Sequence, residues 1–311
     1  MIENAAISPF ADERRNKARA DIFLPDGTLL RSFGEEKVLE VSLIQEFPMK
    51  QPNSPRSETT VVFDNQDNYF DVANPESALY SITNKSFCDI YLSSTEHFAA
   101  DSFVKKSRCF FDGVSDGGLS FSLRFIDVLS CRGFENRSMV GTFDSSSNYK
   151  TVGEIVAKMV RMTGCMFEAD IPEDISETRL EKSSFLTYDS SGTANGYETL
   201  GEGLFSIARR FSEDESQVYL MPDRDGKLSY IRQQTEKSQT ITKKHFYNYE
   251  ILQEEDYLIS RVSDRGNLLL QLGDVVEVAD GNKIFKTEIY KIHYRFARGI
   301  LSSEWEGVIV Q

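Results

Sequence analysis

Apolar and polar positions alternate along much of the first part of the chain. Residues 39–43, 88–92 and 119–125 each carry an apolar side chain at every second position. A period of two gives a strand one apolar face and one wet face, as in an antiparallel sheet. Asp-Gly pairs, which tolerate the positive φ of hairpin turns, lie between such segments at Asp26-Gly27, Asp112-Gly113 and Asp116-Gly117. The pattern predicts antiparallel β structure over this part.

The middle of the chain changes to a helical period. Thr151 with Glu154, and Thr199 with Glu202, are capping boxes at the start of two amphipathic segments, and Gly164 is placed to end the first. The expected buried faces are Val152, Ile155, Val156, Met159 and Val160, then Leu200, Leu204, Ile207, Ala208 and Phe211. Residues 170–196 are polar and predict an exposed loop, and residues 217–231 predict a hairpin. These elements make a small α+β domain.

The last part returns to β structure. Residues 273–278, 283–296 and 300–305 predict strands that turn at Asp280-Gly281 and Arg298-Gly299, like the closing hairpins of a small barrel. Residues 233–242 are polar and lack a period, so we expect a linker there.

Charge and chemistry narrow the function classes. The chain has 311 residues and a net charge of −14, which is unsuited to gripping nucleic acid, since phosphate binding needs clustered Lys and Arg. The N-terminus has no signal-peptide core, and no run reaches the roughly 20 apolar residues of a membrane helix. We expect no membrane association.

No catalytic, metal or cofactor signature stands out. The four cysteines, including Cys131, are widely spaced, and none of the three histidines, including His97, has a metal-ligand spacing to another ligand. His293 is expected to be a wall residue of a strand. Residues 64–71 are rich in Asp and Asn, but they lack the Gly and closing Glu of a calcium loop, which favours a structural turn. We expect no enzyme activity; a cysteine hydrolase using Cys165 and His245 is the less favoured alternative.

Several segments, in order along the chain, resemble the baseplate hub and tail-tip proteins of phage tails. Residues 60–77 read TVVFDNQDNYFDVANPES, a strand followed by a short acidic turn, as in those proteins. The two helices that open with Thr, an aliphatic residue, Gly and Glu are similar as well. So are Asp225-Gly226-Lys227-Leu228, the LGDVVEV run at 272–278, Gly299-Ile300-Leu301 and Trp305-Glu306-Gly307.

The resemblance implies a β-rich α+β fold with two tube-type β-barrel domains and a small α+β domain between them. The implied boundaries are 1–148, 149–235 and 236–311. It also implies a homotrimer whose two barrels per chain form a pseudo-sixfold ring. The implied neighbours are the tail tube or distal tube-initiator protein, a spike or tip protein and baseplate wedge proteins, in a virion tail or bacteriocin-like particle assembled in the bacterial cytoplasm. Because the chain ends at Gln311 without a lytic module, a short hub of a contractile tail is favoured over a long tail-tip protein.

Two further expectations concern ligands. A receptor- or carbohydrate-binding tail module is the main alternative function. A hub must let DNA pass in transit, so its lumen should be acidic or neutral. Candidate lumen-facing acids on the wet faces of strands are Glu40, Asp89, Glu277 and Glu288.

Overall fold

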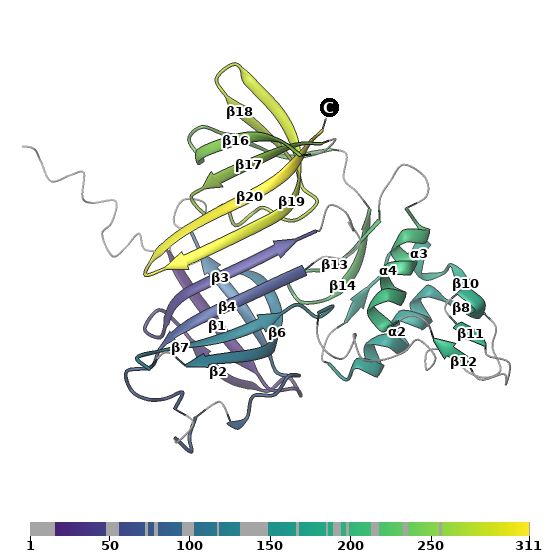
Figure 1. The fold of residues 1–311 in the computed structure, drawn as a ribbon, viewed down its shortest axis with the longest axis horizontal. Coiled ribbons are helices and arrows are strands. Elements are labelled where there is room, and N and C mark those ends of the chain that lie inside the picture. Colours follow the sequence, from purple (N-terminus) through teal and green to yellow (C-terminus); the bar gives the residue numbers. More distant parts are fainter. Residues whose placement is uncertain are drawn as a thin grey trace, which may run out of the picture.

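Strands dominate the computed structural model of the chain (Figure 1). It describes residues 16–47, 56–71, 74–77, 80–94, 103–116, 118–130, 149–165, 168–184, 186–188, 194–196, 199–212, 218–232, 236–254 and 257–310. Two groups of strands lie on one side, and a smaller region of helices and short strands lies on the other. The predicted β-rich α+β class is confirmed.

The first group of strands forms one antiparallel sheet that folds back on itself. Its strands are β1 (Lys17–Phe23), β2 (Leu29–Phe33), β3 (Val38–Glu46), β4 (Arg56–Asp64), β5 (Phe87–Ser93), β6 (Val104–Asp116) and β7 (Ser120–Ile126). They are ordered β3-β4-β7-β6-β5-β1-β2. Figure 1 shows β1 and β2 behind β3 and β4, and apolar residues from both layers, such as Ile90 and Val61, fill a common core. We call this group the first half.

The second group continues the same sheet. Its strands are β15 (Lys237–Thr242), β16 (Phe246–Glu254), β17 (Tyr257–Asp264), β18 (Val275–Asp280), β19 (Lys283–Ala297) and β20 (Ile300–Val310). Strand β19 pairs with β3 from Lys291 opposite Glu46 to Ala297 opposite Glu40. The two β regions that the sequence predicts therefore share one hydrogen-bonded sheet, and we call the second group the second half. The domain boundaries at 148 and 235 stay a prediction.

In the sequence, the region with the helices lies between the two halves, as predicted, whereas in space it lies beside them (Figure 1). It contains β8 (Tyr149–Thr151), α2 (Val152–Thr163), β9 (Ala169–Asp170), α3 (Glu173–Ser176), β10 (Arg179–Glu181), η6 (Lys182–Ser184), β11 (Leu186–Tyr188), β12 (Ala194–Gly196), α4 (Leu200–Arg210), β13 (Val218–Pro222) and β14 (Leu228–Arg232). Both capping boxes form, and Gly164 ends α2 at φ 66°. The two buried helix faces pack with β13 and β14 in a second core.

Three local predictions are wrong. The stretch expected as an exposed loop contains β9, α3 and β10 to β12, which are too short to show a period in the sequence. The expected linker includes β15, a polar strand whose pairing is parallel with β18 and so depends on residues far along the chain. Asp112-Gly113 is not a turn: both residues lie inside β6, and Asp112 is an extra residue between Phe111 and Gly113 in the pairing with β7. Its carboxylate instead forms an ion pair with Arg124.

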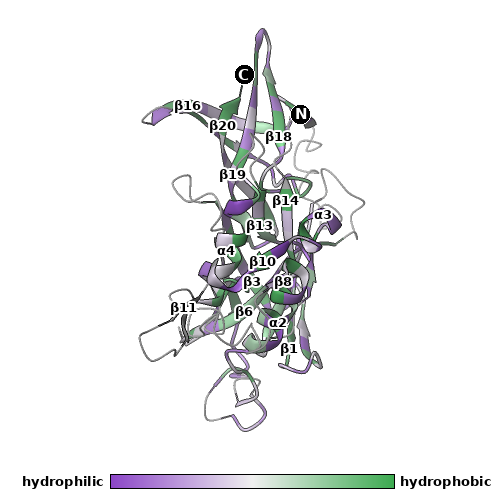
Figure 2. Ribbon diagram, turned by 90° about the vertical axis from the view of Figure 1, so that its right-hand side faces the viewer, coloured by the Kyte–Doolittle hydropathy of each residue, from purple (hydrophilic) through white to green (hydrophobic). Residues whose placement is uncertain are grey.

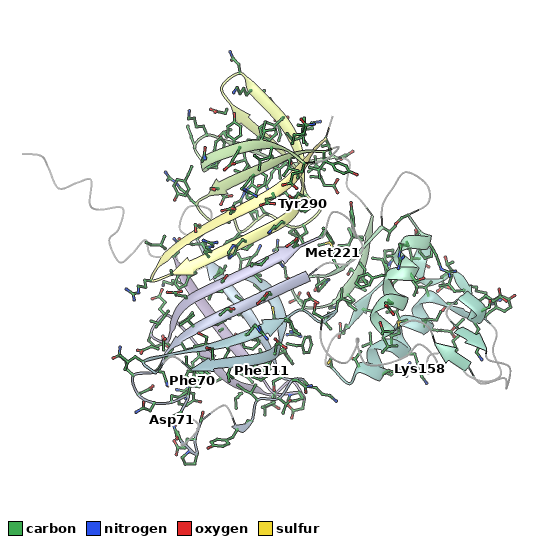
Figure 3. The ribbon with its side chains drawn as sticks, in the orientation of Figure 1. Phe70, Asp71, Phe111, Lys158, Met221 and Tyr290 are labelled. Atoms are coloured by element: carbon green, nitrogen blue, oxygen red, sulfur yellow. The ribbon has the colours of Figure 1, made fainter. Side chains whose placement is uncertain are left out.

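The acidic stretch at 64–71 is a turn held by its own side chains. Asp64 and Asp67 each accept a hydrogen bond from a backbone N–H two residues further on, as Asx turns do. Asn65 accepts from the Phe70 N–H at 2.9 Å. The turn places the Phe70 ring parallel to that of Phe121, 5.0 Å away, at the lower end of the first half (Figure 3).

Polar and apolar residues alternate along the strands of both halves (Figure 2). The core side of this alternation is continuous across the halves, since Val41 and Leu43 of β3 belong to the same cluster as Ile292 and Trp305. None of the helices that the structure describes has the length and apolar character of a membrane span.

Candidate functional site: the polar face of the continuous sheet

The face of the sheet opposite the core carries polar side chains across both halves. In β3, Val41 and Leu43 are buried in the core, whereas Glu40 is exposed. The same alternation places Glu304 and Glu306 of β20 opposite to the buried Trp305. Because the register is continuous from β16 to β7, these outward side chains form rows that cross the strands. We call this surface the polar face.

One row alternates in charge from strand to strand. Its cross-strand neighbours, from β16 to β3, are Glu250, Arg261, Glu306, Lys291 and Glu46. The Arg261 Nε lies 2.8 Å from Glu306 Oε1, and the Lys291 Nζ lies 3.6 Å from Glu46 Oε2. Opposite charges facing each other across antiparallel strands stabilise the pairing. The row also bridges the halves, because Lys291 belongs to β19 and Glu46 to β3.

The middle of this charged row is half-buried, and its groups are tuned by their neighbours. The hydrogen bond to Glu306 raises the pKa of the Arg261 guanidinium above its usual value. Burial acts to raise the pKa of Glu306, but hydrogen bonds from Tyr290 and Arg261 outweigh it and hold that pKa below its usual value. The Tyr290 hydroxyl donates to Glu306 Oε2 at 2.7 Å. Glu306 is thus a carboxylate at neutral pH, and the row keeps its alternating charges.

The neighbouring rows are mixed in sign. The next row contains Glu304, His293 and Glu58, and His293 Nε2 lies 2.9 Å from the Ser42 hydroxyl, as fits a residue in the wall of a strand. Arg295 and Arg124 follow, with Arg124 paired to Asp112, and then Glu40. Among the described side chains of these four rows, acids outnumber bases: Glu40, Glu46, Glu58, Glu250, Glu304 and Glu306 against Arg124, Arg261, Lys291 and Arg295.

Three of the four acids proposed from the sequence lie on the side of their strands that faces away from the core. Glu40 is exposed on the polar face. Glu277 of β18 lies opposite Lys286 and accepts a hydrogen bond from the Thr240 hydroxyl at 3.2 Å. Glu288 of β19 accepts a hydrogen bond from the Tyr219 hydroxyl at 3.0 Å, so it faces β13 of the α+β region. Whether these three acids line a lumen stays a prediction.

Asp89 has a different place. It is buried at 2% exposure, where Arg108 Nε and Nη2 donate to its two oxygens at 2.7 and 2.8 Å and Lys105 Nζ lies 2.8 Å away. A buried carboxylate held by two cations ties β5 to β6 and cannot face an open channel. Asp89 is therefore not a candidate for lining a lumen. The alternation in Phe87–Ser93 suggests a solvent-exposed face, but nearly every residue of this strand is buried.

Sequence reasoning missed the alternating row. The charged residues that form it are separated by up to 260 positions, from Glu46 to Glu306, and only the strand register brings them together. Each strand has a charged residue on its solvent-facing side, which the sequence pattern indicates. The pattern does not indicate which charge on the neighbouring strand lies opposite to it.

The residues considered for catalysis lie apart in the fold. Cys165 follows α2 in a hollow beside Arg108, Arg161 and Lys227, whereas His245 lies in the turn between β15 and β16, with Nδ1 3.3 Å from the Thr242 hydroxyl. Cys131 and His97 lie outside the described residues. Within the described part, no group of three or more His, Cys, Asp or Glu residues is placed to hold a metal ion.

Solved structures with this fold include several phage tail proteins. The 43 kDa tail protein of prophage MuSo2 from Shewanella oneidensis is 10% identical, with a TM-score of 0.59 over 95% of this chain and 98% of that one. A tail protein from Neisseria meningitidis MC58 is 9% identical, with a TM-score of 0.59 over 94% and 96%. A type VI secretion component of Escherichia coli, described as structurally similar to the phage T4 tail proteins gp27 and gp5, is 13% identical, with a TM-score of 0.50 over 88% and 74%.

The chain therefore has the fold of phage tail proteins, along nearly its whole length. No protein-family model matches the sequence, and no curated protein matches it.

Proposed function

We propose that the chain is a structural baseplate hub subunit of a phage tail or phage-tail-like particle, without catalytic activity. Three copies would form a pseudo-sixfold ring that joins a hexameric tail tube to a threefold spike or tip. Further partners would be the distal tube-initiator protein and baseplate wedge proteins. The proposal rests on the fold shared with tail proteins and on the organisation of the sheet.

The arrangement of strands in the sheet supports the proposed ring. Each half contributes neighbouring strands to one layer, β16, β17, β20 and β19 from the second half and β3, β4, β7 and β6 from the first. Two joined sets of four strands per chain give six sets in a trimer, which matches sixfold symmetry on one side and threefold symmetry on the other. Closed rotational symmetry is the usual state of homo-oligomers.

The edge of this layer supports association between copies. Strand β16 pairs with β17 alone among the described strands, so one side of its backbone is free to accept another strand. Tyr247 and Ile251 on β16 are 62% and 47% exposed, although both are large and apolar. An edge strand with exposed apolar side chains is a template for pairing with a further chain.

In the ring, the polar face would line the lumen, with Glu40 among the lining residues. Its mixed and predominantly acidic charge suits DNA in transit, because neutral or acidic walls release no counterions from phosphates. The location would be the tail of the assembled particle.

Size-exclusion chromatography with light scattering tests the ring. We expect a trimer at high concentration or with the tail-tube and spike partners, and a monomer for Ile251→Lys, which places a charge at the β16 edge. Tyr149→Lys, at a 56% exposed position on β8 of the α+β region, is the matched control and should remain trimeric. A wild-type chain that stays monomeric when mixed with both partners would contradict the proposal.

A further inference from the structure

A bulge in the first half aims one lysine at the second half. In the pairing of β5 with β6, Ile90 lies opposite Ser107 and Tyr91 lies opposite Lys105, so Lys106 is an extra residue without a partner. Bulges of this kind turn a side chain away from the direction that the strand would give it. The Lys106 side chain is buried, with 3% of the residue exposed.

The end of this lysine contacts a loop of the second half. Its Nζ donates to the carbonyls of Leu268 and Leu270 at 3.2 Å each, and to the Tyr294 hydroxyl at 3.1 Å. The Tyr294 hydroxyl is in turn 3.0 Å from the Asn267 carbonyl. Residues 265–274 connect β17 to β18, and the side chains of Leu268 and Leu270 are fully buried in the main core. One amino group thus holds the backbone of the loop to β6.

The surroundings of Lys106 leave its charge only weakly balanced. The titratable and charged groups around it are Tyr294 on β19, Asp274 at the end of the loop, Arg224 on the turn between β13 and β14, and Asp127 and Asp223, which line the same cavity. None of the described carboxylates forms an ion pair with it. Burial lowers its pKa to about 7, with a further decrease from Arg224 and an opposing effect of Asp274.

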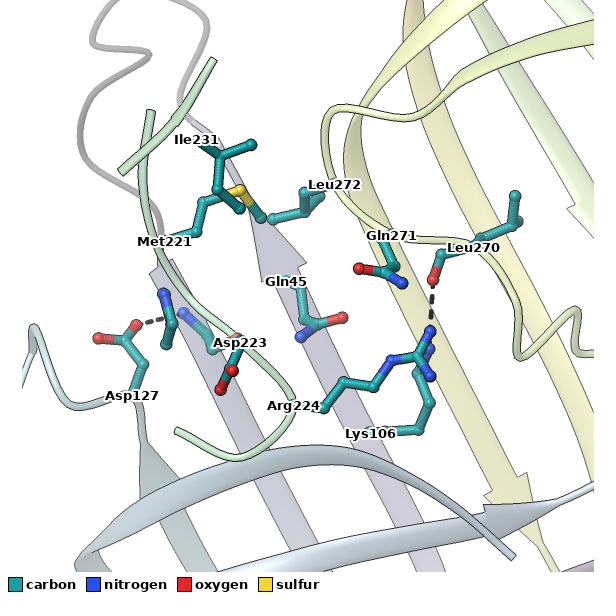
Figure 4. A pocket seen from close by; sticks show the side chains of 12 residues that line it. Gln45, Lys106, Asp127, Met221, Asp223, Arg224, Ile231, Leu270, Gln271 and Leu272 are labelled. Atoms are coloured by element: carbon teal, nitrogen blue, oxygen red, sulfur yellow. Dashed lines mark hydrogen bonds between the residues drawn. The ribbon is translucent and has the colours of Figure 1, made fainter. Parts of the chain in front are cut away.

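A small cavity with both polar and apolar lining residues lies beside the amino group (Figure 4). It has a volume of about 60 Å³ and is lined by Gln45, Arg224 and Gln271 among others. Since roughly 10–15 Å³ of such space holds one water molecule, a few waters can exchange protons with Lys106 without unfolding of the core.

We propose that Lys106 links the two halves of the sheet and that the strength of this link depends on whether the amino group is protonated. We call this contact of Lys106 with the 265–274 loop the pin. As an ammonium it offers three N–H donors to three acceptors, but its charge is buried without a carboxylate partner, so the closed loop disfavours this form. As an amine it keeps two donors, and its lone pair can accept from the Tyr294 hydroxyl, so the closed loop holds it without a buried charge. Protonation therefore loosens the loop, because opening lets water solvate the ammonium.

The pin lies where it can oppose a rotation of one half of the sheet against the other. Among the described strands, the hydrogen-bonded link between the halves is the β3–β19 ladder, which lies along one line. Rotation about that line is opposed by contacts away from it, and the contact of β6 with the loop is one of these. The inference does not depend on the proposed hub function, since it concerns the isolated chain.

Amide hydrogen exchange tests the pin. The N–H groups of Leu269, Leu270 and Gln271 are hydrogen-bonded within the loop, so their exchange reports its opening. After correction for intrinsic rates, we expect protection to rise roughly tenfold between about pH 6 and about pH 8.5, because opening exposes Lys106 to water and returns its pKa toward the usual value. Lys106→Met should abolish this dependence, and Lys283→Met, at an exposed hairpin position, should retain it.

A direct titration covers the case in which Lys106→Met fails to fold. In wild-type protein with ¹³C-labelled lysine, the Lys106 Cε resonance should titrate with a midpoint near pH 7. A midpoint in the usual range of lysine, about 10.4, would overturn the proposal. Loop protection in the wild type that does not change with pH, or a pH dependence that survives in Lys106→Met, would overturn it too.

Discussion

Single buried charged residues hold distant parts of this chain together. Asp264 at the end of β17 accepts hydrogen bonds from Trp305 Nε1 at 3.0 Å, from the Ser303 hydroxyl and from the backbone of the following turn. Asp89 is held by Arg108 and Lys105. Removing one partner of such a group leaves a buried charge uncompensated, which is strongly destabilising.

Lys106 should make the stability of the chain depend on pH. Its pKa of about 7 in the folded state lies below the usual value of 10.5, so between these values the unfolded chain binds the extra proton. Stability from this group is therefore complete above about pH 10.5 and is lost as the pH falls to about 7. Relative to Lys106→Met, the wild-type free energy of unfolding should rise by about 3 kcal/mol from about pH 6.5 to about pH 9.5.

Urea denaturation of both proteins across this pH range measures the difference. Lys283→Met serves again as the control and should follow the wild type. A constant difference between wild type and Lys106→Met would show that the lysine does not titrate in this range.

At the scale of elements, the two long helices are specified by their own sequences. Thr151 and Thr199 accept a hydrogen bond from the backbone N–H of Glu154 and Glu202, and each Glu side chain accepts one from the backbone N–H of its Thr. The apolar faces are buried against β13 and β14, where Leu204 and Ile207 are fully buried. Caps set the ends of these helices, and burial provides most of their stability.

Truncation of Leu204 measures the packing of α4. Leu204→Ala removes a buried side chain and leaves a cavity, so we expect a loss of about 2–5 kcal/mol in the free energy of unfolding. Arg209→Ala, on the exposed face of the same helix, should lose less than about 0.5 kcal/mol. An unchanged urea midpoint for Leu204→Ala would mean that this face does not pack as described.

On the scale of the whole molecule, one sheet spans the two halves and presents the polar face. One of its rows alternates in sign, the others are mixed, and acids outnumber bases among the described side chains. The described side chains of this face form no continuous band of positive charge, and such a band is what holding a polyanion needs.

Charge reversal on this face should create DNA binding. We expect the wild type not to bind double-stranded DNA, and Glu40→Lys, Glu58→Lys and Glu304→Lys combined to bind it with an affinity that falls steeply with salt. Glu35→Lys, Glu76→Lys and Glu181→Lys, three exposed acids elsewhere, change the net charge equally and should bind more weakly. Fluorescence anisotropy with labelled DNA measures all three proteins. Equal binding by the two variants, or binding by the wild type, would contradict a lining role.

Much of the secondary structure was readable because its signals are local. A period of two predicted β3, β5, β7 and β19, and capping boxes with a period of 3.6 predicted α2 and α4. Strand β15 shows no pattern of its own because its stability comes from pairing with β18, and the Asp-Gly pair at 112–113 suits a bulge as well as a turn.

The helices, most of the strands and the acidic balance of the chain follow from local patterns, since each depends on neighbouring residues or on composition. How these elements are used depends on their arrangement in space. Register brought Glu250, Arg261, Glu306, Lys291 and Glu46 into one row, and burial turned Asp89 from a wet-face residue into an internal ion pair. A bulge carried Lys106 into the other half of the sheet. These features depend on contacts between residues far apart in the chain, which no local pattern encodes.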